Sequence, residues 1–460
     1  MKSALFVFAI TGMLAGCGVV QAADEFRPPN VIFILADDLG YGDLGCYGQK
    51  QIQTPHLDRM AAEGMRFTRG YAGSTVCAPS RCALMTGLHM GHATIRGNGF
   101  VPLRPEDMTV AEMLKAAGYS TGLVGKWGLG EAGTTGVPGR QGFDYFYGYL
   151  NQVHAHNYYP DFLWRGEDKV PLDNVQKGGV ASKKVAYSHD LFTAEALAFL
   201  KEHQAQPFFL YLAYTIPHAN NEAGRAGPHG MEVPSLEPYA DKPWPEPQKA
   251  HAAMITRLDR DVGRLFDALR DLKLDEETIV FFSSDNGPHM EGGADPAFFN
   301  SSGGLRGTKR ALYEGGIRVP FIVRWPGKIK AGQVSDVPVA FWDFLPTTVE
   351  LAGGEMRAVL DGRSLVPLLL GRKEDEPLAD RYLYWEFFEG GFQQAAVRGR
   401  WKAVRPKRNG PLELYDLDAD AAEKHDVAAN HPKIVRDFED YMAKARTNSK
   451  DWPVGDGKAK

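Results

Sequence analysis

Residues 31–36 form an uninterrupted apolar run, Val-Ile-Phe-Ile-Leu-Ala, which Asp37, Asp38 and two nearby glycines end abruptly. A short and uniformly apolar run of this kind is typical of a central parallel strand that is buried on both faces. Such a strand requires covering layers on both sides of a sheet. Open α/β sheets bind ligands at the carboxyl ends of their strands, so Asp37 and Asp38 are placed where a site would form.

Strand-like and helix-like segments alternate along the chain after this run. We predict strands at 65–71, 119–124, 208–213 and 278–283, and helices at 54–64, 109–118, 188–202 and 247–272. Within the second helix, Thr109 and Glu112 have the spacing of a capping box. The alternation predicts an α/β fold, with a large and mostly parallel sheet between two layers of helices.

The pattern changes near the C-terminus. Short strands are predicted at 382–387, 393–398, 401–405 and 413–415, followed by a helix from about 431 to 446. We therefore divide the chain into a leader at 1–23, a catalytic domain at 24–375 and a C-terminal α+β subdomain at 376–460, with a small antiparallel sheet and a helix. The segments 128–187, 218–246 and 286–312 are rich in Gly, Pro, His and aromatics, and we expect these long loops to form the walls of a site.

The first 23 residues have the layout of a secretory signal, with Lys2, an apolar run over 4–14 and then small residues. Residues 14–17 resemble a bacterial lipobox that would make Cys17 a lipidated first residue, whereas residues 20–23 resemble an ordinary signal-peptidase site. Both alternatives stay open. We expect an exported protein that is periplasmic, anchored to a membrane as a lipoprotein, or secreted. No later apolar run approaches the roughly 18 residues of a membrane span, so membrane attachment would be through lipid alone.

Charge and cysteine content restrict the classes of partner and of stabilisation. A formal net charge of −5 does not support a protein that coats nucleic acid, so an anionic partner must meet a local cluster of cations. The four cysteines include Cys17 in the leader and Cys77, which leaves Cys46 and Cys82 for one disulfide. One bridge is not a framework for 460 residues, so a large apolar core must stabilise the fold.

Four oxygen-bearing side chains follow two apolar runs: Asp37, Asp38, Asp285 and Asn286. Each of these residues taken alone is more often a cap or turn residue. Two pairs at strand ends need a cation to converge without repulsion. Oxygen donors without histidine or thiolate favour calcium or magnesium over zinc. The residue types therefore predict a site for calcium or magnesium.

Cys77-Ala78-Pro79-Ser80-Arg81 opens a helix-like run that we expect to begin at or just after Pro79, where free backbone N–H groups favour nucleophiles and anions. A buried structural cysteine is the alternative. The pattern Cys-x-Pro-x-Arg resembles the signature of type I sulfatases of the alkaline phosphatase superfamily, whose cysteine a maturation enzyme oxidises to Cα-formylglycine. The resemblance continues in family order through 37–43, 125–127, 284–287 and 309–320, and covers nearly all of the chain from about 30 to about 430.

This resemblance implies a sulfuric ester hydrolase and a role for each matching residue. It implies one calcium ion, with magnesium possible, at Asp37, Asp38, Asp285 and Asn286, to which the formylglycine made from Cys77 also coordinates. The formylglycine is implied to be the nucleophile, Arg81 and Lys126 to hold it, and Lys309 to contact the sulfate. The hydrated aldehyde attacks sulfur, His218 as general acid and Lys309 assist release of the alcohol, and the sulfated diol then expels sulfate. An unmodified thiol would give an adduct with no second hydroxyl to drive release, so modification of Cys77 by a maturase is expected to be essential.

The chain departs from the family at Gly128, where most relatives carry a histidine that is thought to take a proton from the formylglycine. Glycine cannot accept a proton. Either hydroxide performs the step or a histidine of the following loop reaches in, and we prefer His156 to His154. The alternative for both histidines is contact with a sugar.

Two other functions compete with sulfate ester hydrolysis. A phosphomonoester or phosphodiester hydrolase of the same superfamily would normally use Ser or Thr and a two-metal site, and a non-catalytic binder of sulfated glycans would result if Cys77 were never converted. The substrate is expected to be a sulfated small molecule or saccharide. Carbohydrate is favoured because the predicted loops and strands contain aromatic rings that could stack on sugars: Tyr158, Tyr159, Trp164, Trp244 and Trp385.

Overall fold

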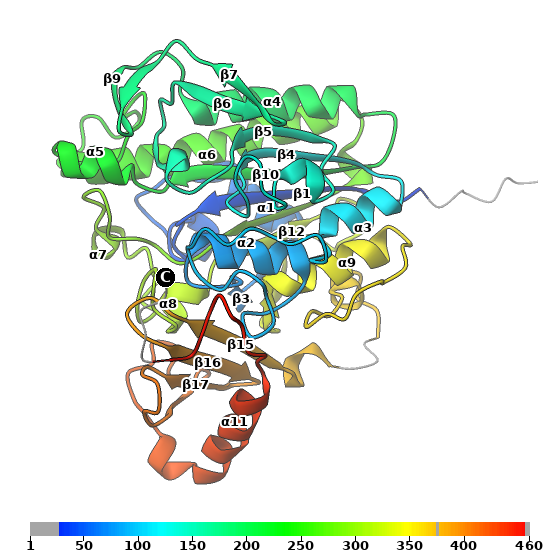
Figure 1. The fold of residues 1–460 in the computed structure, drawn as a ribbon, viewed down its shortest axis with the longest axis vertical. Coiled ribbons are helices and arrows are strands. Elements are labelled where there is room, and N and C mark those ends of the chain that lie inside the picture. The colour runs from blue at the N-terminus through cyan, green and yellow to red at the C-terminus, as the bar shows by residue number, and fades with distance from the viewer. Residues whose placement is uncertain (1–26, 374–376, 456–460) are drawn as a thin grey trace, which may run out of the picture.

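The computed structural model describes residues 27–373 and 377–455 (Figure 1). The leader predicted at 1–23, including Cys17, lies outside the described residues. The central strand of the fold is β1 (Asn30–Asp37), which is buried at every position. It pairs in parallel with β10 (Phe208–Pro217) on one side and β11 (Thr278–Ser284) on the other, which confirms the doubly covered strand predicted from the apolar run.

A ten-stranded sheet surrounds β1, in the order β13-β2-β12-β11-β1-β10-β4-β5-β6-β7. Its centre, from β11 to β5, is parallel, and includes β4 (Ser120–Lys126) and β5 (Tyr145–Tyr149). Towards one edge lie β12 (Phe321–Arg324), antiparallel to both its neighbours, β2 (Met65–Phe67), and β13 (Gln333–Ser335), which runs parallel to β2. At the other edge, β6 (Phe162–Arg165) and β7 (Asp168–Pro171) are antiparallel. The prediction of a mostly parallel sheet therefore holds for its centre.

The segment 128–187 is not the continuous loop that we expected. It contributes β5, β6 and β7 to the main sheet and a separate hairpin of β8 (Val175–Lys177) and β9 (Val180–Lys183). The residues of β7 and β8 are largely exposed, so these edge strands lack the apolar alternation by which a strand is recognised.

Two layers of helices cover the sheet, as Figure 1 shows. Ile32 and Ile34 of β1 belong to a core with α1 (Pro55–Glu63), α4 (Ser188–Glu202) and α6 (Glu246–Asp271). Alternate residues of β1, among them Phe33, face a second core with α2 (Cys77–Thr86), α3 (Val110–Ala116) and α9 (Phe344–Leu351). The capping box of Thr109 and Glu112 is present at the start of α3.

The disulfide considered between Cys46 and Cys82 is not formed, and both are free thiols. Cys82 belongs to the core under α2, whereas Cys46 packs against the core on the opposite face of the sheet. The central sheet therefore separates the two sulfur atoms.

The C-terminal part is the predicted antiparallel sheet with its helix. The strands β15 (Tyr382–Phe387), β16 (Gln393–Arg398), β17 (Trp401–Arg405) and β18 (Glu413–Asp416) pair in sequence order, and α11 (Pro432–Lys444) packs beside them. Buried ion pairs join this sheet to the large domain, with 3.0 Å between Lys402 Nζ and Glu314 Oε1. The fold class predicted from the sequence is confirmed.

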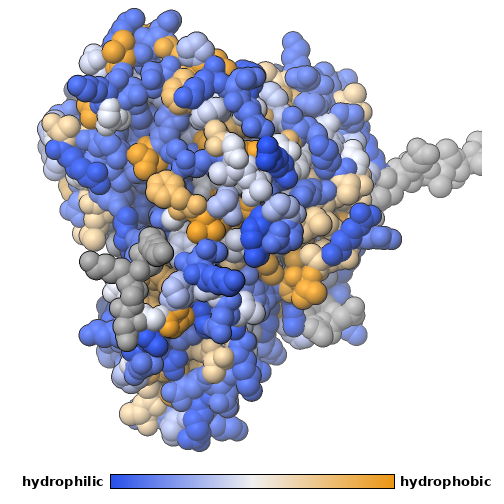
Figure 2. Space-filling model, in the orientation of Figure 1, coloured by the Kyte–Doolittle hydropathy of each residue, from blue (hydrophilic) through white to orange (hydrophobic). Residues whose placement is uncertain are grey.

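The remaining elements are short: β3 (Gly70–Tyr71), β14 (Val339–Ala340), α5 (Asn221–Ala226), α7 (Pro296–Phe299), α8 (Glu314–Ile317) and α10 (Val366–Leu369). Across the described ranges, no helix has both the length and the apolar character needed to cross a bilayer. The face drawn in Figure 2 is largely hydrophilic, with apolar residues in several small groups.

Candidate active site

The carboxyl ends of the central parallel strands meet at one edge of the sheet and bring the predicted site residues together. Asp37 and Asp38 lie at the end of β1, Lys126 ends β4, His218 follows β10, and Asp285 and Asn286 follow β11. Asp38 adopts a left-handed backbone conformation, with φ of 66°, which is uncommon for a residue other than glycine. Its N–H donates to Asp285 Oδ1 at 3.1 Å, so the two strand ends are tied to each other.

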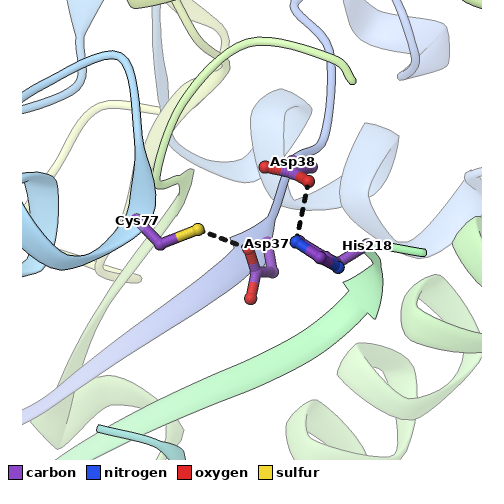
Figure 3. Close-up of side chains that lie close together, drawn as sticks. All are labelled: Asp37, Asp38, Cys77 and His218. Atoms are coloured by element: carbon purple, nitrogen blue, oxygen red, sulfur yellow. Dashed lines mark hydrogen bonds and ion pairs between the residues drawn. The ribbon is translucent and has the colours of Figure 1, made fainter. Parts of the chain in front are cut away.

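Cys77 is the first residue of α2, two residues earlier than the predicted start of this helix. Pro79 lies within the first turn, where its missing N–H costs no intrahelical hydrogen bond. The N–H of Ala78 donates to Asn98 Oδ1 at 3.0 Å. The thiol of Cys77 is 2% exposed and points towards Asp37, with Sγ 3.4 Å from Oδ1 (Figure 3).

Three buried cations pair with the three carboxylates of the site. Lys126 Nζ lies 2.6 Å from Asp37 Oδ2, and Lys309 Nζ lies 2.8 Å from Asp38 Oδ2. The guanidinium of Arg81 donates to Asp285 Oδ2 from Nε at 3.1 Å and from Nη2 at 2.8 Å. Its Nη1 also donates to the carbonyl of Lys126 at 2.7 Å, which connects α2 to the end of β4.

The electric field of these cations and the burial of the site set the charge state of Asp37 and Cys77. Burial alone would raise the pKa of Asp37, but the charges of Lys126, Arg81 and Lys309 together hold that pKa well below its usual range. Burial raises the pKa of the Cys77 thiol well above its ordinary value, and Asp37 adds to the effect. An unmodified Cys77 is therefore protonated at neutral pH, and a thiol is a much weaker nucleophile than a thiolate.

His218 is held in one tautomer. Its Nδ1–H donates to the carbonyl of Ala219 at 2.6 Å, and because a carbonyl can only accept, Nε2 carries the lone pair. Nε2 accepts from Lys309 Nζ at 3.1 Å and lies 3.4 Å from Asp38 Oδ2 (Figure 3). Burial lowers the pKa of His218, and the charge of Lys309 lowers it further. The imidazole is thus neutral, and the ammonium of Lys309 is the proton donor of the pair.

The chemistry of the acidic edge fits a hard cation. Asn286 Oδ1 is buried and has no hydrogen-bond partner within the described ranges, while its Nδ2 donates to Asp38 Oδ1 at 2.6 Å. A buried oxygen without a partner is costly, and a bound cation would satisfy it. Ligand atoms of Asp37, Asp38, Cys77 and His218 all lie within 4.8 Å of one another. This group shares Asp37 and Asp38 with the four residues expected to bind calcium, and the unpartnered oxygen of Asn286 fits an oxygen-preferring ion.

The structure distinguishes between His154 and His156, the two candidates to replace the histidine that most relatives carry where this chain has Gly128. His156 lines the same pocket as Cys77 and stacks on His218, with 4.9 Å between ring centroids. His154 packs between Tyr149 and Phe162, at 4.9 and 4.5 Å between centroids, and is not among the residues that line the pocket. In an extended segment, two residues that are one residue apart point to the same side, but His154–His156 form a turn of 3₁₀ helix, so the two rings diverge.

Cys77, His218 and Lys309 line a pocket of about 490 Å³, whose other walls come mainly from residues 98–102, 128–134 and 150–153. None of the five aromatic residues expected to stack on sugars lines this pocket. Tyr158, Tyr159 and Trp385 are buried in the cores instead. The aromatic side chain at the pocket is Phe100, which is 87% exposed and which the sequence did not single out, because an isolated Phe in a glycine-rich loop matches no motif.

Three further polar residues of the site were not identified from the sequence. Glu291 Oε2 lies 3.5 Å from Lys309 Nζ, and the ring of His289 stacks on His218 with 5.7 Å between centroids. Glu222 accepts from Nδ1 of His156 at 3.0 Å. These residues lie in the loops 218–246 and 286–312, which we expected to form walls of the site, and no other feature of the sequence pointed to them.

Residues 29–354 match the family model described as Sulfatase, and residues 307–448 match that described as N-sulphoglucosamine sulphohydrolase, C-terminal. An N-acetylgalactosamine-6-O-sulfatase of Bacteroides thetaiotaomicron is 30% identical, over 95% of this chain and 97% of its own. Arylsulfatase A of Homo sapiens is 36% identical, over 90% of this chain and 82% of its own. The crystal structure of Ps i-CgsB in complex with k-i-k-neocarrahexaose has a TM-score of 0.77 and 29% identity, over 94% of this chain and 96% of its own. The family model covers more than half of the chain and both relatives match most of it, so the chain, whose cysteine, cations and acids meet at one sheet edge, belongs to the sulfatase family.

Proposed function

We propose that this sulfatase releases inorganic sulfate from a sulfated carbohydrate, using a formylglycine made from Cys77 and one calcium ion. The observation that carries the proposal is the position of Cys77. It lies at the start of a buried helix, in a pocket that it shares with Lys309 and His218, and its sulfur is 3.4 Å from a carboxylate that Lys126 neutralises.

The chain's own residues would bind and neutralise the ester. Sulfuryl transfer develops negative charge on the oxygens around sulfur and on the departing oxygen, which positive groups in a buried site stabilise. Lys309 is the ammonium donor beside His218, so this pair is placed to deliver a proton to the departing oxygen. Arg81 connects α2 with the ends of β4 and β11 and keeps residue 77 in place.

Conversion of Cys77 to formylglycine would supply an aldehyde hydrate, with one hydroxyl to attack sulfur and a second to drive release of sulfate. A calcium ion would act as a Lewis acid on the sulfate oxygens, held by Asp37, Asp38, Asp285 and Asn286. The unpaired oxygen of Asn286 supports this assignment.

We assign to His156 the role of proton acceptor for the formylglycine, which Gly128 cannot perform. The carboxylate of Glu222 can only accept, so Nδ1 of His156 carries the proton and Nε2 carries the lone pair. Burial lowers the pKa of His156, and Lys126 lowers it further, which keeps the ring neutral. A neutral ring that a carboxylate orients has the form of a general base.

A carbohydrate substrate is supported by the relatives. One similar enzyme is named as an N-acetylgalactosamine-6-O-sulfatase, and one similar structure contains an oligosaccharide. A substrate outside the cytoplasm would agree with the leader predicted at 1–23, which would export the enzyme.

The direct test is a mass measurement combined with an assay. The chain is expressed with a formylglycine-generating maturase, and the tryptic peptide of residues 70–81 should be about 18 Da lighter than its cysteine form. The same preparation is tested for free sulfate on a panel of defined sulfated saccharides. Full activity in a preparation whose peptide 70–81 is entirely in the cysteine form would refute the mechanism.

A further inference from the structure

Two amide side chains of the pocket have polar atoms without partners. Gln152 Nε2 and Oε1 and Asn221 Oδ1 are all buried and make no hydrogen bond within the described ranges. Both residues line the pocket that contains Cys77. Two neighbouring amides differ from them, since Asn98 Oδ1 accepts from Ala78 N–H at 3.0 Å and Asn151 Oδ1 accepts from His154 N–H at 2.8 Å. Unpartnered buried polar groups call for an explanation, and in a substrate pocket the substrate is one.

Gln152 occupies the space over Gly128. The backbone of Gly128 is left-handed, with φ of 83°, and a Cβ added there would lie 2.2 Å from Gln152 Nε2. The two segments are tied together, because Gly128 N–H donates to the carbonyl of Leu150 at 2.9 Å. The amide of Gln152 thus lies beside the segment that directly follows Lys126, and glycine at 128 leaves room for it.

The chemistry of an amide points to hydroxyl groups rather than to sulfate. An uncharged amide both donates and accepts, as a hydroxyl does, whereas sulfate oxygens only accept and are already matched by buried cations. Apolar residues also line this pocket, namely Phe100, Val101, Pro102 and Val153. A sugar ring has an apolar face and a rim of hydroxyls, so it suits an apolar wall with a few polar groups.

We propose that Gln152 and Asn221 are specificity-determining residues, whose amides hydrogen-bond hydroxyl groups of the sugar that carries the sulfate ester, while Phe100 covers an apolar face of that ring. The proposal rests on the carbohydrate sulfatase activity proposed above. It concerns recognition of the alcohol part of the substrate, and it leaves the groups that act on sulfur unchanged.

The test uses the mature enzyme and the best substrate found among monosulfated hexoses and N-acetylhexosamines, together with the monodeoxy analogues of that substrate. Gln152→Met keeps the length of the side chain and removes both hydrogen-bonding atoms. We expect it to raise KM and to lower kcat/KM about tenfold on the parent sugar, which is the effect of one or two lost hydrogen bonds. On one deoxy analogue, which lacks the recognised hydroxyl, the variant and the wild type should differ less than twofold.

Asn221→Leu should behave in the same way with a different deoxy analogue. Gln204→Met is the matched control, since Gln204 is an exposed glutamine outside the pocket, and it should change neither kcat nor KM. Thermal unfolding of each variant reports on folding, and Gln152→Ala replaces Gln152→Met if the latter is unstable.

The outcomes separate the two proposals. A Gln152→Met enzyme that equals wild type on the parent sugar, or that loses equally on the parent and on every deoxy analogue, overturns the recognition role. A wild-type enzyme that releases sulfate from none of the sugars overturns the proposed carbohydrate substrate instead.

Discussion

At the scale of the residue, Cys77 is surrounded in a way that a structural cysteine would not need. It shares one pocket with Lys309 and His218, and its sulfur contacts a carboxylate that is itself paired with Lys126. Cys82 offers a comparison on the same helix, because it is equally buried but lies in the apolar core.

We predict that Cys77→Ser abolishes turnover when the protein is made in a host whose maturase works on cysteine. The serine hydroxyl would not become an aldehyde hydrate, so no second hydroxyl would drive the release of sulfate. Release of free sulfate measures the effect. Cys82→Ala is the control and should retain activity, whereas a Cys77→Ser enzyme with wild-type turnover would contradict the mechanism.

The pair of histidines gives a second prediction. His156→Ala should lower kcat sharply and leave KM little changed, and a sulfated enzyme should accumulate, because the proton acceptor for the second step is lost. His154→Ala should have little effect on kcat, since His154 packs between Tyr149 and Phe162 and not at the pocket. Steady-state kinetics and intact-protein mass test both variants. If His156→Ala raises only KM, His156 binds the sugar and the base is elsewhere.

At the scale of the element, the ends of β1, β4 and β11 and the start of α2 act as one charged unit. Arg81 is fully buried and reaches both the carboxylate after β11 and the last carbonyl of β4. Removal of one partner of a buried ion pair typically destabilises a protein by about 3–5 kcal/mol, because the remaining charge has no partner. These elements therefore depend on each other's charges as well as on packing.

Asp285→Ala should accordingly remove bound calcium and activity together, and should also lower the thermal stability because Arg81 loses its carboxylate. Asp285→Asn, which keeps the shape and hydrogen-bonding capacity of the side chain, should lose the metal at a smaller cost in stability. Metal analysis by mass spectrometry and thermal unfolding measure the two effects. Calcium content equal to that of the wild type in Asp285→Ala would show that the ligand assignment is wrong.

At the scale of the whole molecule, the C-terminal part packs against the catalytic domain through buried polar groups that respond to pH. His89, which lies just after α2, is buried against β15 of the C-terminal sheet, where its ring contacts Tyr384 at 5.3 Å between centroids. The N–H of Gly91 donates to His89 Nδ1 at 3.1 Å, and Nε2 lies 3.5 Å from Asp361 Oδ1. Burial lowers the pKa of His89 to about 4, and Asp361 opposes that shift only in part.

We predict from this arrangement that stability falls with acidification. The unfolded chain takes up a proton on this histidine near pH 6.5, whereas the folded chain does so near pH 4, so the contribution is present above about pH 6.5 and is lost as the pH falls towards 4. Each pKa unit corresponds to about 1.4 kcal/mol, so His89 alone accounts for at most about 3.5 kcal/mol. Urea unfolding between pH 7.5 and 4.5 measures the slope, and His89→Asn should flatten it. An identical slope in His89→Asn would rule this histidine out as the source.

Much of this architecture could be predicted from local pattern, because a buried strand such as Val31–Ala36 is apolar along its whole length and a capped helix such as that after Thr109 carries its own boundary signal. The antiparallel edge strands could not be predicted in this way, because β7 has largely exposed side chains and is held by pairing with β6 rather than by burial. Phe100 and Gln152 were not identified from the sequence for the same reason. Their roles depend on which loops meet in the folded protein, and the neighbouring residues in the sequence do not indicate which loops these are.

The sequence by itself determined the α/β class and the central strand. It also predicted a set of site residues, because Asp37 and Lys126 end apolar segments and Cys77 opens the Cys-x-Pro-x-Arg pattern. Only the tertiary structure decided which polar groups face the reaction. A single turn of 3₁₀ helix brings His156 and not His154 to the pocket, and the left-handed backbone of Gly128 leaves a space that Gln152 fills. The physical reason is that strand burial is a local property of side-chain polarity, whereas a pocket is a relation between segments that touch only after the sheet has formed.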